Sequence, residues 1–214
     1  KFLFFSTNDV YRSSDHEIDE SEPLDASSIY AKTKLEAENL ILQAYSNGPL
    51  DVLILRPASI YGEYDTGSMT SLISLCKHGV VPVIGSGENV KALLYVKEVA
   101  NFVRTYIGGE VLPGVSIANI ASGNYSFVQI INTINDVFDL NSRVIKLPLF
   151  LKDNRIFAKS KNFQKLKAAS ESKKVNFDKI KRSYGFVSSY DLKAGLTDSL
   201  EYYKEFCKLE KRKK

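Results

Sequence analysis

The sequence has few residues of the kinds that build metal clusters or disulfide frameworks. Its 214 residues include two cysteines, Cys76 and Cys207, and two histidines, His16 and His78. The cysteines lie far apart in the chain, which favours reduced structural thiols over a disulfide or a metal site. Two isolated histidines are too few for a zinc or iron cluster, so we expect no bound metal.

Long apolar runs are also lacking. No run is long enough to span a bilayer, and no basic-then-apolar signal peptide opens the chain. We therefore expect a cytoplasmic protein with no membrane partner. Internal repeats and low-complexity segments are absent as well, and 44% apolar with 25% charged residues is an ordinary globular balance.

Charge of one sign is in small excess, with a net charge of +4. Much of that excess follows residue 150. Such a basic tail is more typical of a solvated helix end than of a nucleic-acid site, so we expect no nucleic-acid partner. A mildly basic protein suits an anionic substrate such as a sugar diphosphate. The tail ends in Lys208, Lys211, Arg212, Lys213 and Lys214.

Apolar runs alternate with segments of helical period along the chain, which implies an α/β fold with a mostly parallel sheet. The run Phe2 to Phe5 has no polar alternation and predicts a strand buried on both faces. The polar residues 12–28, with Pro23, predict a surface loop. We expect strands at residues 2–5, 52–55, 80–84, 93–95, 116–121 and 144–147, and helices at 29–46, 69–77, 97–107, 126–138, 149–169, 178–184 and from 189 or 191 onward.

Two further expectations concern the ends of these elements. The helix over residues 29–46 has Ser27 or Ser28 as its N-cap, and the strand before it begins directly after Lys1. A central parallel strand needs neighbours on both sides, so we expect a further segment to precede this one. The apolar side of the helix is predicted to consist of Leu35, Ala37, Leu40, Ile41 and Ala44.

Tyr30 and Lys34 are spaced i, i+4 on this helix, so their side chains share one face. A tyrosine hydroxyl ordinarily titrates near 10, and a nearby ammonium favours its phenolate. Such a pair suits removal of a proton from a sugar hydroxyl while hydride leaves the same carbon. The spacing alone is weak, because about one such pair is expected by chance.

The motifs around the pair strengthen its interpretation. In chain order they are Ser6-Thr7-Asn8-Asp9-Val10-Tyr11, Tyr30-Ala31-Lys32-Thr33-Lys34, Arg56-Pro57-Ala58-Ser59-Ile60-Tyr61-Gly62, Gly85-Ser86-Gly87, Tyr95-Val96, Asn119-Ile120-Ala121-Ser122-Gly123 and Asp178-Lys179-Ile180…Tyr184-Gly185-Phe186. With these motifs the sequence resembles the extended short-chain dehydrogenase/reductase family, in its NAD-dependent epimerase/dehydratase branch. That family has a Ser/Thr-rich strand end, a Tyr-x-x-x-Lys helix and an Arg-Pro…Tyr-Gly strand end in this order. The resemblance covers nearly the whole chain and is weakest near residues 143–172.

The resemblance implies the C-terminal portion of a Rossmann-like, doubly wound parallel sheet with a smaller α/β substrate-binding subdomain. Residues 1–62 would form the second half of the dinucleotide-binding domain and carry catalysis. Residues 63–214 would mainly bind substrate, with the strand and helix near 93–121 returning to the main sheet. Members often pair through helices, including the one that bears the tyrosine, so the resemblance also implies a homodimer.

By position, the resemblance also implies residue roles. Thr7, Tyr30 and Lys34 would be catalytic, with Thr7 bonded to the reacting sugar oxygen and sharing its proton with Tyr30. Lys34 would also hold the nicotinamide ribose. The cofactor-binding residues would be Ser6, Tyr30, Lys34, Pro57 and Ala58, and the substrate-binding residues would be Thr7, Ser59 and Lys91.

Three positions depart from the family pattern. Lys91 stands where a common Arg grips the diphosphate, and a lysine binds phosphate as a point charge rather than with two parallel bonds. Asn8-Asp9 replaces the Asp-Glu that serves 4,6-dehydratases as acid and base, which argues against dehydration because an amide is no general acid. Arg12 replaces a glycine, and we assign it no role.

The Gly-rich turn through which this family holds NAD is not found. Gly85-Ser86-Gly87 is the nearest match, but a strand rather than a helix is expected after it. We interpret it, like Gly108-Gly109, as a turn. This chain alone is therefore expected not to bind NAD, or alternatively NADP, tightly, and to be the C-terminal portion of a longer enzyme.

Two functions remain open within the resemblance. One is an NAD(P)-dependent epimerase acting at C4 of a UDP-sugar through a 4-keto intermediate, and the other is a nucleotide-sugar 4-keto reductase. We favour the epimerase, because nothing marks a special second acid or base. From a different class, a catalytically inert fragment or a non-enzymatic binding member is the alternative, since the cofactor loop is not found.

Overall fold

The computed structural model describes residues 1–45, 48–109, 112–153 and 160–209. The chain divides into two compact units, each built from segments far apart in sequence. Unit 1 consists of residues 1–60, 92–124 and 173–189, and unit 2 of residues 61–91, 125–172 and 190–214.

Unit 1 contains parallel strands, three α-helices and one 3-10 turn. The strands β4, β6 and β8 include the points at which the chain passes from one unit to the other. The elements are β1 (Phe2–Phe5), η1 (Asn8–Val10), β2 (Ser14–Ile18), α1 (Ile29–Tyr45), β3 (Val52–Pro57), β4 (Ser59–Tyr61), β6 (Val90–Tyr95), α3 (Val96–Gly108), β7 (Val115–Ile120), β8 (Gly123–Ser126), β10 (Lys173–Val175) and α6 (Asp178–Tyr184).

The central sheet of unit 1 has the order β1-β3-β7, with all strands parallel. This confirms the predicted parallel α/β architecture. Phe5 pairs with Leu55, and Pro57 pairs with Ile120. The side chains of Leu3, Phe4 and Phe5 in β1 are partly buried. Leu3 and Phe5 pack against one apolar cluster and Phe4 packs against the other, so both faces of the strand are covered, as predicted.

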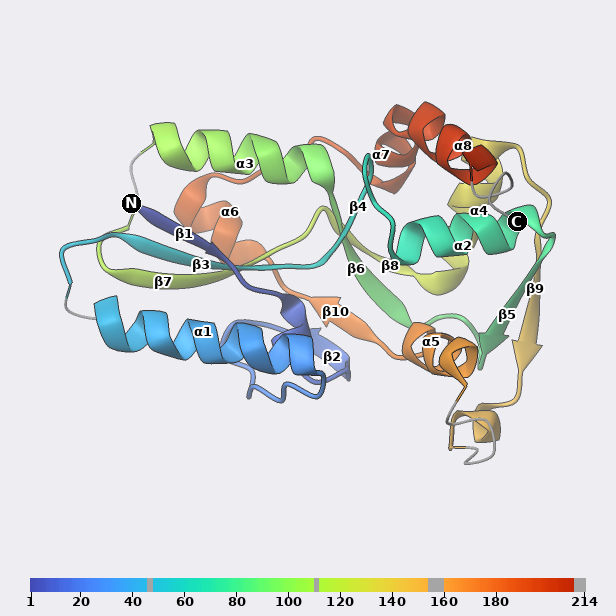
Figure 1. Cartoon of the computed structure of the whole chain (residues 1–214), viewed down its shortest axis with the longest axis horizontal. Helices are drawn as coiled ribbons and strands as arrows, with labels where there is room; N and C mark the ends of the chain where they lie inside the picture. The colour runs from blue at the N-terminus through green and yellow to red at the C-terminus, as the bar shows by residue number, and fades with distance from the viewer. Residues whose placement is uncertain (46–47, 110–111, 154–159, 210–214) are drawn as a thin grey trace. The chain divides into compact units, whose positions relative to one another are not determined.

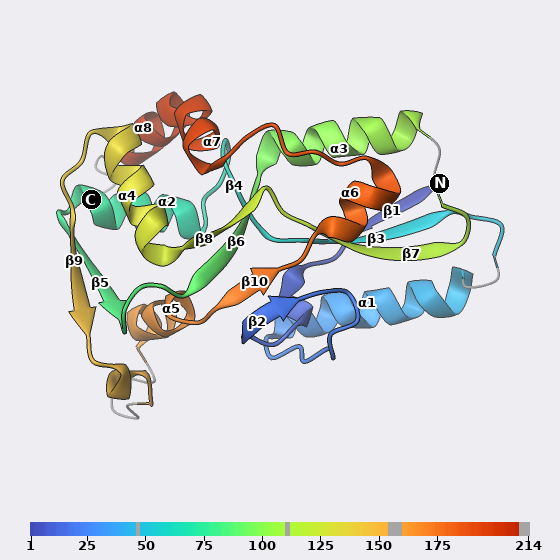
Figure 2. The ribbon, with the colours of Figure 1, turned by 180° about the vertical axis from the view of Figure 1, so that it is seen from behind.

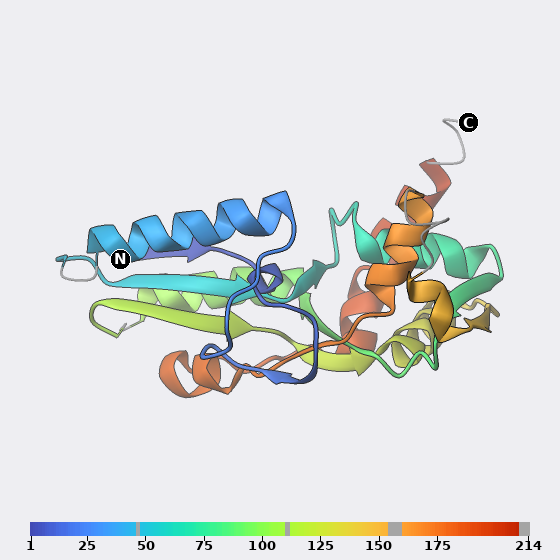
Figure 3. The ribbon, with the colours of Figure 1, turned by 90° about the horizontal axis from the view of Figure 1, so that it is seen from below.

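Helices cover both faces of this sheet (Figures 1 and 2). Helix α1 covers one face, where Ile41 packs with Val52 and Ile54. Helices α3 and α6 cover the other, where Phe102 and Ile180 join one apolar cluster with the strands. Figure 3 shows the sheet between α1 and α6. Because successive residues of a strand face opposite sides, the two clusters take alternate residues of β3, as a doubly wound sheet requires.

The buried face of α1 includes Leu35 and Ile41, as predicted, but differs from the prediction at other positions. Ser28 Oγ accepts a hydrogen bond from Ala31 N at 3.0 Å, which confirms Ser28 as the cap. Leu40 is 60% exposed and Ala44 is also exposed, whereas Glu38 is 1% exposed. The hydrophobic pattern misplaced the face because a paired carboxylate occupies the centre of the buried stripe. The last predicted residue of this helix, residue 46, lies outside the described part.

Two further expectations in unit 1 need correction. The strand expected to stop before Arg56-Pro57 continues through both, since β3 ends at Pro57. Residues 12–28, expected as a surface loop, contain β2, which pairs in parallel with β10. This second sheet has the order β2-β10-β6-β4, with β8 paired to β6. Strand β2 has exposed polar residues and one buried apolar end, Ile18, so it lacks the pattern that would predict a strand.

Unit 2 packs helices with a two-stranded parallel sheet of β5 and β9. Ser126 and Gln129 form a capping box at the start of α4, as the expected cap at Ser126 implies, and Asp191 caps α7. The helix predicted over residues 149–169 is η2 and α5, and residues 154–159 lie outside the described part. The elements are α2 (Ser68–Lys77), β5 (Val80–Ile84), α4 (Phe127–Phe138), β9 (Arg143–Leu147), η2 (Leu149–Asp153), α5 (Lys161–Ala169), α7 (Leu192–Asp198) and α8 (Leu200–Leu209).

Candidate active site

The ends of β1 and β3 place several predicted residues at one edge of the central sheet. Ser6 N donates to Leu55 O at 2.7 Å, and Ala58 N donates to Ile120 O at 2.9 Å. The three parallel strands therefore end together, and ligands of open α/β sheets bind outside such carboxyl ends. Pro57 and Ala58 are buried there, while Ser59 is exposed.

Thr7 begins the short turn η1 that follows β1. Its Oγ1 accepts a hydrogen bond from Asp9 N at 3.1 Å, so Thr7 is the N-cap of η1. Thr7 is 7% exposed. A hydroxyl that accepts in this way keeps its own proton for donation to a ligand. The turn therefore holds the Thr7 side chain in one orientation near the sheet edge.

Tyr30 and Lys34 lie one turn apart near the start of α1. Lys34 Nζ donates to Phe5 O at 2.8 Å and lies 6.0 Å from the centroid of the Tyr30 ring. The Tyr30 ring is 53% exposed, which leaves its hydroxyl accessible to a substrate. Lys34 thus joins the end of β1 to the first turn of α1, with the Tyr30 ring on the other side of its ammonium.

A buried ion pair that sequence analysis missed lies beside these residues. Arg56 Nε donates to Glu38 Oε1 at 3.0 Å and Nη2 donates to Oε2 at 2.5 Å, with side chains 2% and 1% exposed. The Ser6 hydroxyl also donates to Glu38 Oε1. The signal was present in the spacing, because Glu38 follows Lys34 by four residues on the same face of α1.

The third donor of Arg56 extends the pair into a network. Nη1 donates to Tyr11 Oη at 2.6 Å, and the Tyr11 hydroxyl donates to Asn119 Oδ1 at 3.0 Å. Glu20 Oε1 accepts from Asn119 N at 2.8 Å. Burial raises the pKa of Tyr11, although Arg56 opposes that shift. Burial acts to lower the pKa of Arg56, but the bonds and charge of Glu38 outweigh it and the net pKa rises. Both groups therefore keep the protonation states that the network needs.

The two residues at the position of the dehydratase acid and base are held by a lysine. Lys173 Nζ donates to Asn8 O at 3.3 Å and to Asp9 Oδ1 at 3.1 Å. Asn8 is buried, whereas the Asp9 side chain is 56% exposed. Arg12 is exposed and gains no assigned role.

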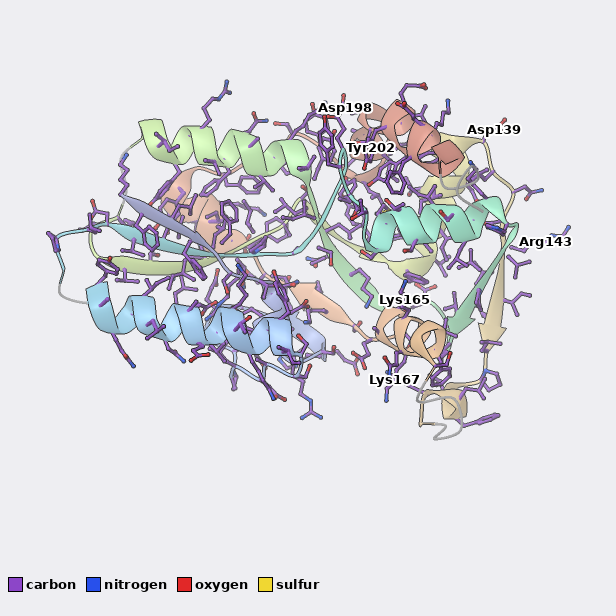
Figure 4. The ribbon with its side chains drawn as sticks, in the orientation of Figure 1. Asp139, Arg143, Lys165, Lys167, Asp198 and Tyr202 are labelled. Carbon is purple, nitrogen blue, oxygen red and sulfur yellow. The ribbon has the colours of Figure 1, made fainter. Side chains whose placement is uncertain are left out.

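Lys91, the predicted diphosphate ligand, belongs to unit 2. Its Nζ donates to Ala168 O at 2.7 Å, near the C-terminal end of α5. The same helix carries Lys165 and Lys167, and Arg143 begins β9 (Figure 4). Cations near the end of a helix also stabilise its dipole. Through this bond Lys91 has a structural role, in addition to the diphosphate-binding role that is predicted for it.

The Gly85-Ser86-Gly87 segment is a turn between two strands, as predicted. Gly85 and Gly87 adopt φ angles of 86° and 82°, in the left-handed region that favours glycine. A Cβ at Gly87 would lie 2.5 Å from Val128 Cγ2. Since β6 rather than a helix follows, the turn offers no helix N-terminus to phosphate.

Metal and membrane features were also sought among the described residues. No group of three or more His, Cys, Asp or Glu side chains lies close enough there to hold a metal ion. Cys76 is a buried free thiol, while the side chain of Cys207 lies outside the described part. The described helices include none with the length and hydropathy of a membrane span. Of the predicted basic tail, Lys211 to Lys214 and the side chain of Lys208 are outside the described part.

Comparison with known proteins gives a family for the first half of the chain. The model of the family described as "NAD dependent epimerase/dehydratase family" matches residues 1–120. One relative is the N-acetyl-alpha-D-glucosaminyl-diphospho-ditrans,octacis-undecaprenol 4-epimerase of Escherichia coli O157:H7, which is 28% identical over 94% of this chain and 64% of its own length. The dTDP-D-glucose 4,6-dehydratase of Mus musculus is 34% identical over 61% of this chain and 38% of its own.

A solved structure supports the fold. The UDP-glucuronic acid 4-epimerase from Bacillus cereus in complex with NAD superposes with a TM-score of 0.74 and 17% identity, over 96% of this chain and 62% of that one. At this identity the likeness establishes the Rossmann-like α/β fold alone. The chain thus spans a little under two thirds of the length of the Escherichia coli and Bacillus cereus 4-epimerases.

Proposed function

Because this chain belongs to the NAD dependent epimerase/dehydratase family, we propose that it carries the proton-transfer and sugar-binding residues of an NAD(P)-dependent nucleotide-sugar 4-epimerase. The observation that carries the proposal is the bond from Lys34, which lies beside the Tyr30 ring, to Phe5 O at the end of the strand that leads to Thr7. Unit 1 would perform catalysis and unit 2 would mainly bind the substrate, a UDP-sugar in the first instance.

In this mechanism the chain moves one proton. The Thr7 hydroxyl donates a hydrogen bond to the C4 oxygen of the sugar. Tyr30 takes the proton of the sugar's C4 hydroxyl as C4 is oxidised. A bound nicotinamide cofactor supplies the hydride acceptor for this step. After the 4-keto sugar rotates in the site, hydride would return to the opposite face of C4, and Tyr30 returns the proton to the same oxygen. Tyr30 thus begins and ends the cycle as a phenolate, beside the ammonium of Lys34.

The residues present fit one end of that cofactor. Pro57 and Ala58 present uncharged buried surface at the end of β3, and Ser6 and Lys34 lie at the neighbouring strand end. These four residues, with Tyr30, would hold the nicotinamide and its ribose. The phosphates fit less well, because the Gly85–Gly87 turn leads into a strand. We propose that these 214 residues alone bind NAD or NADP weakly. Micromolar binding in a calorimetric titration of this chain would contradict that.

Turnover tests the function itself. The protein expressed from its complete reading frame is mixed with NAD and UDP-glucose, UDP-N-acetylglucosamine or UDP-glucuronic acid, and the C4 epimers are followed by proton NMR. We expect epimerisation without net consumption of the cofactor, and loss of turnover in Tyr30→Phe with the fold intact. Stoichiometric NAD(P)H oxidation by a 4-keto sugar would instead indicate the reductase. Turnover by neither route would favour a non-enzymatic member.

A second substrate class has specific support. The Escherichia coli relative, by its name, acts on a sugar carried by undecaprenyl diphosphate, and it matches 94% of this chain. A diphosphate is common to that carrier and to a UDP-sugar, so Lys91, the predicted diphosphate ligand, suits both. Comparing N-acetylglucosaminyl-diphospho-undecaprenol in detergent with UDP-N-acetylglucosamine in the NMR assay separates them. The homodimer implied by the family stays a proposal, tested by sedimentation of the same preparation.

A further inference from the structure

Three residues form one stripe on α1. Tyr30, Lys34 and Glu38 follow one another at intervals of four residues, so each lies about 6 Å further along the same face of the helix. Lys34 bonds to Phe5 O and Glu38 accepts from the Ser6 hydroxyl. Two consecutive residues at the end of β1 are thus attached to two consecutive turns of α1, directly before Thr7.

The residues that follow Thr7 are also bonded to the buried ion pair of Glu38 and Arg56. Tyr11 ends the η1 turn that Thr7 begins, and its hydroxyl accepts from Arg56 Nη1 at 2.6 Å. Arg56 Cζ also lies 4.9 Å from the centroid of the Tyr11 ring. Ser6 before Thr7 and Tyr11 after it are therefore both bonded to members of one buried ion pair, Glu38 and Arg56.

The ion pair of Glu38 and Arg56 is better suited to orienting the groups bonded to it than to stabilising the fold. A buried pair of charges is desolvated, and apolar residues of similar volume often stabilise a fold equally well. Apolar contact is non-directional, whereas two parallel N–H···O bonds fix the direction of both partners. A third directed bond from the same guanidinium reaches the Thr7 turn. The network thus supplies directions that an apolar core would not.

We propose that Glu38 and Arg56 are positioning residues, which set the Thr7 hydroxyl against the Tyr30–Lys34 face of α1 for proton transfer. This inference rests on the proposed function. Neither residue touches the substrate; both act through Ser6 and Tyr11. Their loss should lower kcat and leave the KM for the sugar nucleotide nearly unchanged, since misplacement of a reacting group by about 1 Å costs about 100-fold in rate.

The decisive variant removes both charges, as Glu38→Leu with Arg56→Met, in the protein expressed from its complete reading frame. A purely structural pair predicts that this variant recovers both stability and kcat. A positioning pair predicts an unfolding temperature within about 4 °C of the parent and a kcat lowered about 100-fold. The matched control is Glu201→Leu with Lys204→Met, which removes an exposed ion pair from α8 and should change neither.

A second variant covers the case in which the double variant does not fold. Arg56→Lys keeps the charge and loses the planar fork, so we expect it to fold and still to lose about 100-fold in kcat. A kcat within about twofold of the parent, in either folded variant, would overturn the proposal.

A measurement without turnover separates this proposal from the function on which it rests. Amide hydrogen exchange of residues 6–11 should accelerate about tenfold in the folded variants, while residues 80–84 of β5 in unit 2 exchange as in the parent. Unchanged exchange at residues 6–11 would overturn the positioning role. A parent protein with no activity on any sugar nucleotide would overturn the proposed function, and the exchange result would still decide whether the pair holds this turn.

Discussion

Lys34 Nζ donates a hydrogen bond of 2.8 Å to Phe5 O, so the ammonium of α1 lies directly against the end of β1. Lys34 Nζ also lies 6.0 Å from the centroid of the Tyr30 ring and 5.1 Å from the centroid of the Phe4 ring. The charge therefore lies between the proposed proton-transfer residue and the sheet. One lysine therefore links the position of the helix to the chemistry of its first turn.

We expect Lys34→Met to lower kcat for epimerisation about 100-fold, because the cation beside the ring of the proposed proton-transfer residue is removed. The free energy of unfolding should fall by about 1 kcal/mol, since the bond to Phe5 O is lost. Steady-state kinetics and urea unfolding measure the two effects. Lys32→Met on the exposed side of α1 is the matched control and should change neither. Normal turnover in Lys34→Met would remove this lysine from the mechanism.

The pair of Glu38 and Arg56 predicts a large effect on stability. Glu38→Ala leaves the Arg56 guanidinium buried without its counter-charge, and we expect a loss of about 3–5 kcal/mol in the free energy of unfolding. Glu36→Ala, on the same helix but exposed, should stay within about 0.5 kcal/mol of the parent. Equal effects of the two substitutions in urea unfolding would show that Glu38→Ala does not leave Arg56 as an uncompensated buried charge.

Unit 2 has a close approach that a single methyl group would disturb. A Cβ at Gly195 of α7 would lie 2.3 Å from Tyr61 Oη and 3.0 Å from Tyr61 Cζ. Because Tyr61 is buried, we expect Gly195→Ala to destabilise the protein by about 1–3 kcal/mol. At Gly108 a Cβ would meet nothing within 4 Å, so Gly108→Ala is the control. Calorimetric unfolding of the two variants should differ clearly, and a Gly195→Ala protein as stable as Gly108→Ala would refute the contact.

The buried thiol of Cys76 predicts a pH dependence. Burial raises its pKa above the ordinary 9.0, so the native state keeps a proton that the unfolded chain loses first. Its contribution to stability is therefore complete below pH 9.0 and is lost as the pH rises through the native pKa. Between about pH 8 and about pH 10, we expect the unfolding temperature of Cys76→Ala to fall less than that of the parent.

The control for this pH series is Val81→Ala, a buried change without a titrating group. It should lower the unfolding temperature by a similar amount at every pH. A decline with pH in Cys76→Ala that is as steep as in Val81→Ala would contradict the role of the thiol.

Local chemistry made much of the fold predictable. The apolar runs at residues 2–5, 80–84 and 144–147 are strands, and Ser126 caps its helix. These elements follow from periodicity and capping, which act over a few neighbouring residues. The short strands β2 and β10 escaped prediction, because each is stabilised by the other across more than 150 residues rather than by its own pattern.

The candidate site divides in the same way. The set of Thr7, Tyr30 and Lys34 could be predicted from the sequence, since their spacing and the order of the surrounding motifs are properties of the chain. The burial of Glu38 and its bonds to Arg56, Ser6 and, through Arg56, Tyr11 became visible in the folded chain alone. From the sequence, a charged residue on a helix is expected to face solvent. The free energy of burying it depends on a counter-charge, which is brought near only by folding.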